Sequence, residues 1–256
     1  GLIKSDGGVM NLNAITGLNG VVTINGGTLR LNSGSDNTIP VIATLASPTL
    51  MLLTLNGGAT LDIGAKNQTV NGLTSVNPLP GMGGTVTGLA GAVFTTTNNS
   101  TFAGSITGGL SFQRAGNTTT ILTAPSTYTG TTTVRGGILQ LRDEASILNT
   151  SAITINYGEL RWDNFGFNAA ANPTRISPTT PITLNGGLLN ISGGGGVDTD
   201  ITLGTVTANS GNVHFYTQPF INEGSTNKIV VTNFVRTLES RSMVNFNGWT
   251  ETKNST

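Results

Sequence analysis

A short phrase of residues that recurs along the chain limits its fold more than any other feature. It reads Thr, apolar, Asn, Gly, Gly, any residue, Leu, any residue, apolar. Its copies, some of them degenerate, lie at residues 23–31, 54–63, 106–112, 133–141, 154–162, 183–191 and 207–215. The separations of equivalent glycines, from Gly27 to Gly58 and from Gly109 to Gly137, are too long for successive hairpin turns. They fall within the period of about 20 to 50 residues that is typical of solenoids and other repeat arrays.

The phrase has the chemistry of two short strands joined by a sharp corner. Threonine alternates with aliphatic residues before the glycines, as in Thr23 and Ile24, and this alternation is typical of a strand with one inward face. Asn-Gly and Gly-Gly supply the positive φ angles that a tight corner requires. Asn-Gly is ordinarily a hairpin signal. Hairpin-built sandwiches, however, carry turn signals about every 8 to 12 residues, so the longer period favours a coil.

In a coil, equivalent residues of successive turns stack on one another. We therefore expect the leucines that follow Gly-Gly to form a ladder inside the coil, and the asparagines to form a ladder at an outer corner. Dividing the 256 residues by a repeat of about 25 predicts about ten coils. We expect residues 1–256 to form a single all-β unit, a parallel β-helix (β-solenoid) with protruding loops. Because Gly1 opens the chain without an initiator Met or the apolar core of a signal peptide, we expect a fragment of a longer repeat protein.

Composition disfavours several classes of function. Only 9% of the residues are charged and the formal net charge is zero, so we expect no nucleic acid or anionic lipid as a partner. There is no cysteine, which rules out disulfides and thiolate metal sites. No apolar run approaches the roughly 18 residues of a membrane helix. We expect no membrane span, no metal and no cofactor.

The run from Tyr128 to Leu139 has a more specific pattern than the other copies. It matches Tyr-Thr-Gly-x-Thr-x-Val-x-x-Gly-x-Leu position by position, within a segment spanning 108–141. In this it resembles the autotransporter-associated β-strand repeat. The resemblance implies a right-handed parallel β-helix in a passenger or giant surface protein that is exposed outside a Gram-negative or related cell. The other copies lack the Tyr-Thr-Gly lead.

Several segments between the copies of the phrase are predicted to be loops. Residues 76–84 and 168–181 carry prolines, and residues 193–196 are all glycine. We expect all three segments to protrude from the body of the coil. Residues 141–148 have the composition of one or two helical turns or of a charged loop, and we favour the loop.

Parallel β-helices also occur in polysaccharide lyases and glycoside hydrolases, so acidic pairs are candidate catalytic residues. Hydrolysis of a glycoside needs two carboxylates roughly 5 to 9.5 Å apart. The close pairs are Asp143 with Glu144, and Asp198 with Asp200, which would share one side of a strand. We interpret Asp198 and Asp200 as a polar loop edge. His214 alternates with apolar residues, and we expect an outward, solvated side chain. We therefore assign no catalytic, metal-binding or cofactor-binding residue.

Two further patterns have both a functional and a structural interpretation. Trp162, Phe165 and Phe167 would stack on sugar rings if exposed, but we favour a local core beneath a long loop. Threonine triplets begin at Thr95, Thr118 and Thr131. Ice-binding solenoids carry ranks of threonine that repeat in every coil, and the irregular spacing here disfavours that function.

These observations together predict a structural or adhesive β-solenoid on a bacterial surface or outside the cell, within a fibre or surface layer. Partners would be other copies of the chain, through the open ends of the solenoid, and glycans on host or neighbouring cell surfaces. A carbohydrate-active β-helix enzyme and a passive display stalk remain as alternatives.

Overall fold

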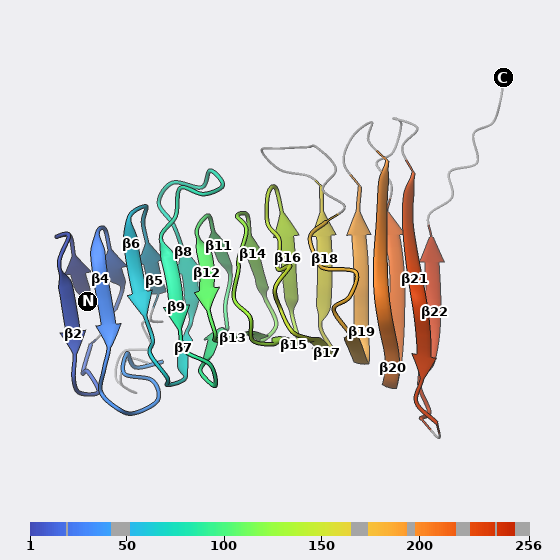
Figure 1. Ribbon diagram of the computed structural model, residues 1–256, viewed down its shortest axis with the longest axis horizontal. Helices are drawn as coiled ribbons and strands as arrows, with labels where there is room; N and C mark the ends of the chain where they lie inside the picture. The colour runs from blue at the N-terminus through green and yellow to red at the C-terminus, as the bar shows by residue number, and fades with distance from the viewer. Residues whose placement is uncertain are drawn as a thin grey trace.

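The computed structural model describes residues 1–18, 20–41, 52–164, 174–193, 198–218, 226–238 and 240–248. Within these ranges the regular structure consists of β-strands, and no helix is present. The strands lie side by side along the longest axis of the molecule (Figure 1). The prediction of an all-β chain is therefore confirmed for the described residues.

The strands form three faces, and one passage over the three faces is called a coil below. The first face contains β1 (Leu2–Lys4), β3 (Val22–Ile24), β5 (Leu52–Leu55), β8 (Gly72–Thr74), β11 (Ser100–Phe102), β14 (Thr119–Leu122), β16 (Ile138–Arg142), β18 (Glu159–Asp163), the second half of β19 (Ile182–Ser192), the end of β20 (Thr199–Gln218) and β22 (Met243–Gly248). The second face contains β2 (Val9–Leu12), β4 (Gly27–Leu31), β6 (Ala59–Asp62), β9 (Thr85–Gly88), β12 (Ser105–Gly108) and, later, the starts of β20 and β21 (Asn227–Arg236). The third face contains β7 (Gln68–Val70), β10 (Val93–Thr96), β13 (Ser111–Ala115), β15 (Thr132–Arg135), β17 (Ile153–Asn156), the first part of β19, the middle of β20 and the end of β21.

Every pairing between these strands is parallel. Successive pairings join the strands of the first face in an unbroken series, from β1–β3 to β20–β22. The number of residues in a coil varies. Phe94 pairs with the nearby Phe112, whereas Val22 pairs with Leu53, which lies much farther along the chain. The arrangement is consistent with the predicted parallel β-helix, and the described strands do not form hairpins.

The recurring phrase marks all three corners of the coil rather than one. Copy 23–31 bends from β3 on the first face to β4 on the second, and copy 106–112 bends from β12 on the second to β13 on the third. Copy 133–141 bends from β15 on the third face to β16 on the first. Two neighbouring copies therefore need not lie one coil apart. The number of residues between their glycines does not give the number of residues in a coil. Each corner needs a sharp bend between two strands, so the same chemistry serves all three.

Aliphatic side chains stack inside the coil, as the sequence predicts. Leu139 pairs with Leu160, and Leu160 pairs with Leu189, in three successive strands of the first face. All three side chains are at most 1% exposed. On the second face Leu29 pairs with Leu61, and both are fully buried. The predicted internal leucine ladder is confirmed, and burial of this apolar surface is the main favourable term in folding.

Asparagine side chains form ladders along the outer corners. Nδ2 of Asn185 donates to Oδ1 of Asn156 at 2.7 Å, and Nδ2 of Asn209 donates to Oδ1 of Asn185 at 2.7 Å. Near the start of the chain, Nδ2 of Asn56 donates to Oδ1 of Asn25 at 2.8 Å. Each amide thus bonds to the equivalent amide of the next coil, and the predicted corner ladder is confirmed.

The Tyr-Thr-Gly lead of the best-matched copy is a packing motif. Tyr128 is 1% exposed, and its hydroxyl lies 2.6 Å from Oγ1 of Thr132, while burial raises the pKa of the phenol above its ordinary value. The backbone N–H of Thr129 donates to the carbonyl oxygen of Gly108 at 2.9 Å, which continues the second face without a regular strand. A Cβ on Gly130 would lie 2.3 Å from the carbonyl oxygen of Leu110, so only glycine fits there.

The predicted loops have different outcomes. Residues 76–84 connect β8 to β9 without regular strand structure, and this segment protrudes beyond the strand ends (Figure 1). Residues 141–148 begin with the last residues of β16 and continue as a turn and loop, so the charged-loop interpretation is confirmed. In 168–181, residues 168–173 lie outside the described residues; the rest is a loop, but its expected protrusion is wrong at Arg175, which is fully buried. Of 193–196, only Gly193 is described.

Shortening a rung of the leucine ladder should destabilise the whole coil. We expect Leu139→Ala to lower the free energy of unfolding by about 2–5 kcal/mol, because a cavity remains between fully packed neighbours. Leu148→Ala is the control, since Leu148 is 43% exposed and its truncation should cost less than about 0.5 kcal/mol. Denaturant unfolding followed by circular dichroism measures both, and equal losses for the two variants would contradict the internal position of Leu139.

Candidate binding groove

The outer side of the first face carries two columns of side chains in the second half of the chain. One column consists of Ile138, Glu159, Leu188, His214 and Asn245. The other consists of Gln140, Arg161, Asn190, Tyr216 and Asn247. The columns arise because side chains two residues apart on a strand point to the same side, and parallel register stacks them from coil to coil.

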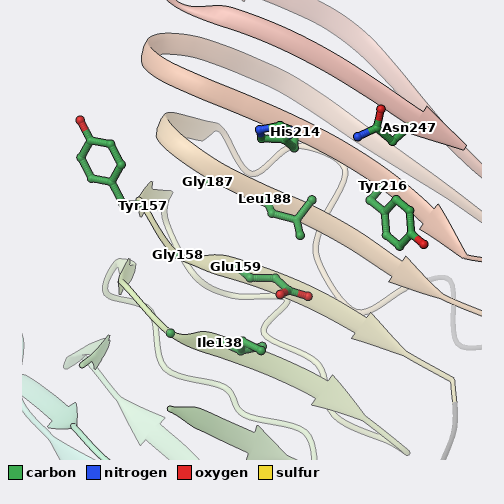
Figure 2. A pocket seen from close by; sticks show the side chains of 10 residues that line it. Ile138, Tyr157, Gly158, Glu159, Gly187, Leu188, His214, Tyr216 and Asn247 are labelled. Carbon is green, nitrogen blue, oxygen red and sulfur yellow. The ribbon is translucent and has the colours of Figure 1, made fainter. Parts of the chain in front are cut away.

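A groove of about 440 Å³ runs over these columns (Figure 2). Seven side chains line it, namely those of Ile138, Tyr157, Glu159, Leu188, His214, Tyr216 and Asn247. Glycines at positions 137, 158 and 187 add no side chains at its corner end, where Tyr157 contributes one. The groove is therefore hollowed beside the corner glycines, and aliphatic, polar and aromatic side chains on the strands form its walls.

Tyr157 stands at a corner where the equivalent copies of the phrase have glycine. Its φ angle is +56°, close to the +71° of Gly136 and the +75° of Gly186. A residue other than glycine in this left-handed region costs about 1–2 kcal/mol. The ring is nevertheless exposed, because the tyrosine as a whole is 76% exposed. A Cβ on Gly186 would lie 2.9 Å from ring atoms Cδ1 and Cε1, so the ring of Tyr157 lies against the bare corner of the next coil.

The carboxylate of Glu159 is held in place by two neighbours. Nε of Arg161 donates to its Oε1 at 2.5 Å, and Nδ2 of Asn190 donates to the same oxygen at 2.8 Å. Asn190 is 6% exposed, so this second contact is shielded from water. Among the described residues, no hydrogen bond reaches Oε2. The groove thus presents one fixed carboxylate group as an acceptor.

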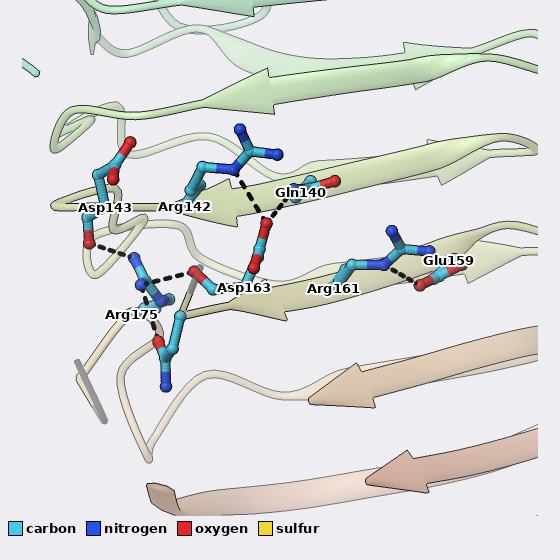
Figure 3. Close-up of polar contacts among 8 residues, drawn as sticks. Gln140, Arg142, Asp143, Glu159, Arg161, Asp163 and Arg175 are labelled. Carbon is cyan, nitrogen blue, oxygen red and sulfur yellow. Dashed lines mark hydrogen bonds and ion pairs between the residues drawn. The ribbon is translucent and has the colours of Figure 1, made fainter. Parts of the chain in front are cut away.

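A charged cluster lies beside the groove, at the far end of the same strands (Figure 3). Oδ2 of Asp163 accepts hydrogen bonds from Nε2 of Gln140 and, at 2.9 Å, from Nε of Arg142. Asp163 is 5% exposed, and its partners come from the preceding coil. The cluster therefore ties β18 to β16 through side chains as well as through the backbone.

Arg175 extends this cluster into the loop that follows. Its Nη1 donates to the carbonyl oxygens of Asp143 and Ala145 at 2.9 and 2.8 Å. Its Nη2 donates to the carbonyl oxygen of Asp163 at 3.1 Å and to Oδ1 of Asn164 at 3.0 Å. Burial lowers the pKa of the guanidinium to about 10, and the charges of Asp163 and Asp143 oppose this shift. These contacts hold the loop against the coil, so we interpret the cluster as structural.

The acidic pairs considered from the sequence do not line the groove. Asp143 is buried and Glu144 is exposed, so the two do not share one surface. Asp198 and Asp200 are both exposed, as expected for residues two apart on one side of a strand. Oδ1 of Asp198 accepts hydrogen bonds from the backbone N–H and the hydroxyl of Thr226 at 2.6 and 2.9 Å, and these bonds lower the pKa of that carboxyl. This geometry fits the predicted polar loop edge.

The other candidate residues divide between the core and the groove. Trp162 is 1% exposed, so the core interpretation is correct for it, while Phe165 and Phe167 lie outside the described residues. His214 points outward, as predicted, but lies half-buried in the groove lining rather than freely solvated. Sequence reasoning missed the groove; the signal for it was Tyr157 in a glycine position.

Threonines also form a rank, on the outer side of the third face. The aligned positions are Thr69, Thr95, Gln113, Thr133, Thr154, Thr183 and Thr207. The irregular spacing in the sequence results from unequal coil lengths and does not reflect the alignment in space, so that argument against threonine ranks is wrong. Beside Thr95 and Thr133, however, the positions two residues away include Val93 and Arg135, so the flanking rank is not threonine.

The described ranges contain neither a group of metal ligands nor a membrane-spanning helix. Within them, no three His, Cys, Asp or Glu side chains are grouped so that they could hold a metal ion. No helix in the same ranges has the length and apolarity needed to cross a bilayer.

Removing the guanidinium of Arg175 should destabilise the fold. We expect Arg175→Met to lower the free energy of unfolding by about 3–5 kcal/mol, because the buried carbonyl oxygens and the amide oxygen of Asn164 lose their donor, and the nearby charges of Asp143 and Asp163 lose a compensating charge. Arg135→Met is the matched control, since Arg135 is exposed and its loss should cost less than about 0.5 kcal/mol. Chemical unfolding measures both, and a neutral Arg175→Met would contradict the structural role of the cluster.

Comparison with known proteins finds a similarity to an adhesin. The chain is 31% identical over 225 residues to the "Adhesin BmaC autotransporter" of Brucella suis biovar 1 (strain 1330), and the match covers 84% of this chain. It covers only 6% of that protein. No protein-family model matches the chain, and no solved structure matches it. The chain is thus distantly similar, over most of its length, to a short stretch of a much longer autotransporter adhesin.

Proposed function

We propose that the chain is a segment of a right-handed β-solenoid, displayed on or secreted from a bacterial cell, that acts as an adhesive surface element. The similarity of 84% of the chain to an autotransporter adhesin is the observation that carries this proposal. The handedness follows from the general preference of parallel β crossovers for the right-handed sense. The matched relative is far longer, so we propose this role for the segment rather than for a whole protein.

The outer surface of the coil supports an adhesive role over a passive stalk. Side chains on regular strands are positioned more precisely than side chains on loops. In this chain the parallel register aligns polar side chains into columns on the first face, and the groove lies over those columns. A stalk needs a rigid body but has no need of such a surface.

A carbohydrate-active enzyme has weaker support. Hydrolysis of a glycoside needs two carboxylates facing one another. The described lining of the groove contains a single carboxylate, that of Glu159, and Asp198 and Asp200 lie elsewhere. We therefore propose binding rather than turnover.

Binding and turnover can be separated in one experiment. We expect the labelled chain to bind saturably to cultured cells or immobilised cell-surface glycoconjugates, and the Asp198→Asn, Asp200→Asn double variant to bind equally well. Neither form should release reducing ends from polysaccharides. Reducing ends released by the wild-type chain and lost in the double variant would establish the enzyme instead, and absence of binding to every surface would refute the adhesive role.

Apolar side chains at the two ends of the described coil favour a second property, end-to-end association. Ile3 and Val9 are 73% and 58% exposed, and Met243 and Phe246 are 56% and 70% exposed. The strands that carry them pair with a neighbour on one side in the described part of the chain. Unpaired strand edges with apolar neighbours favour pairing with another chain.

Association through the ends should depend on concentration and on Phe246. We expect electron microscopy to show single rods at low concentration and end-to-end filaments at high concentration. Phe246→Asp should prevent filaments, because a carboxylate would have to be buried at the joint. The control is Leu79→Asp in the protruding loop, where Leu79 is 48% exposed and away from both ends. Single rods at every concentration would contradict this association.

A further inference from the structure

We propose that the groove on the first face is a binding site for a neutral oligosaccharide, with the ring of Tyr157 as the surface on which a sugar ring stacks. This inference deepens the adhesive function proposed above and rests on it. The site spans successive coils, and its side chains come from the third-to-first corner and from β16, β18, β19, β20 and β22 (Figure 2).

Tyr157 is the residue that the fold itself does not explain. Glycine occupies the equivalent place at Gly136 and Gly186, where the backbone has the same left-handed conformation. Tyrosine is strained there, and because it is 76% exposed, burial of its side chain does little to offset the backbone strain. Strain that the structure does not need is typical of functional sites. The ring lies against the bare corner at Gly186, so one side is supported and the rest faces solvent.

The rest of the groove lining suits the apolar side of a sugar. Leu188 and Ile138 add aliphatic side chains to the lining, and the glycines at 158 and 187 let a ligand approach the backbone closely. Tyr216 contributes a second aromatic group from the neighbouring column. The volume of about 440 Å³ lies in the range of about 300–1,000 Å³ that is typical of small-molecule sites. The ring of tyrosine is apolar and carries a polar hydroxyl group at its end. It can therefore stack on the apolar face of a sugar and form a hydrogen bond to a sugar hydroxyl.

The polar groups of the groove match hydroxyl groups. Glu159 offers an acceptor that Arg161 and Asn190 hold in place. His214 and Asn247 have both donor and acceptor capacity, as a sugar hydroxyl does. These groups come from different coils, so they are spaced along the groove and can contact more than one sugar unit.

Charge favours a neutral ligand over a sulfated or sialylated one. The described lining includes one carboxylate and no Lys or Arg. The guanidinium of Arg161, which lies beside the lining, is already paired with Glu159. Recognition of an anionic sugar relies on charge-assisted contacts from Arg or Lys, and the groove does not provide an unpaired one within its described lining.

The position of the groove on the sheet disfavours an extended peptide as its occupant. Peptides commonly bind a sheet by adding a strand at a free edge. Under the groove, β18 is paired with both β16 and β19, and β19 is paired with both β18 and β20. The backbone groups beneath most of the groove are therefore already bonded, and recognition there must use side chains. Among the described strands, β22, which carries Asn247 at the end of the groove, is paired with β20 alone.

The decisive variant is Tyr157→Gly, which restores the residue found at the equivalent corners. An array of neutral, sialylated and sulfated glycans is screened with the wild-type chain, and the strongest neutral oligosaccharide is then titrated by calorimetry. We expect Tyr157→Gly to weaken binding about tenfold, since stacking on an aromatic ring contributes on this scale. Its melting temperature should be unchanged or higher, because glycine adopts the corner conformation without strain.

Two further variants separate the groove from the rest of the surface. His214→Ala should also weaken binding severalfold, since it removes a hydrogen-bonding group from the lining. Gln113→Ala, on the third face, should leave binding and stability as they are. Loss of binding in all three variants, or in none, would overturn the assignment of the groove.

The outcomes also distinguish the groove from the adhesive function. If the wild-type chain binds cells or glycans and Tyr157→Gly binds equally, the groove is the wrong site while adhesion stands. If the wild-type chain binds only sialylated or sulfated glycans, or binds a protein equally well after its glycans are removed, the neutral sugar is the wrong ligand. If it binds no cell and no glycan, both proposals fail.

Discussion

The backbone pairing of each coil with the next determines the rest of this structure. Every named strand pair is parallel, although the length of chain needed to return to the same face varies from coil to coil. Parallel pairing places equivalent residues in line, so inward leucines of successive coils form a ladder and corner asparagines of successive coils form a chain of amide contacts. The internal ladder and the outer columns are consequences of the same register.

The class of fold could be predicted because the residues that form each corner are adjacent in the sequence. Alternating Thr and aliphatic residues, followed by Gly-Gly, specify a strand, a bend and a strand whichever face they join. For the same reason, the sequence could not reveal that copies 23–31, 106–112 and 133–141 occupy different corners. Coil length could not be counted from glycines, since loops such as 76–84 lengthen one coil and leave its register intact.

The groove could be predicted only in part, because it depends on register between residues far apart in the chain. His214 faces outward on a strand, as alternation predicts, but its place beside Leu188 follows from the pairing of β20 with β19. That pairing contains register shifts between Leu184 and Gly187, which no local pattern indicates. Tyr157 was visible as a departure from the phrase, whereas its support by the corner at Gly186 required the structure.

The equivalence of the three corners has a consequence for how such a rod can change. Gain or loss of a single strand with its corner would rotate all later coils by one face, while inward residues would still meet inward residues. A groove downstream of the change would then point in a different direction around the axis of the rod, with its own side chains and register unaltered. The direction in which a surface faces can therefore change without any change in the residues that form it. A small insertion far from a site can turn that site to another side of the rod.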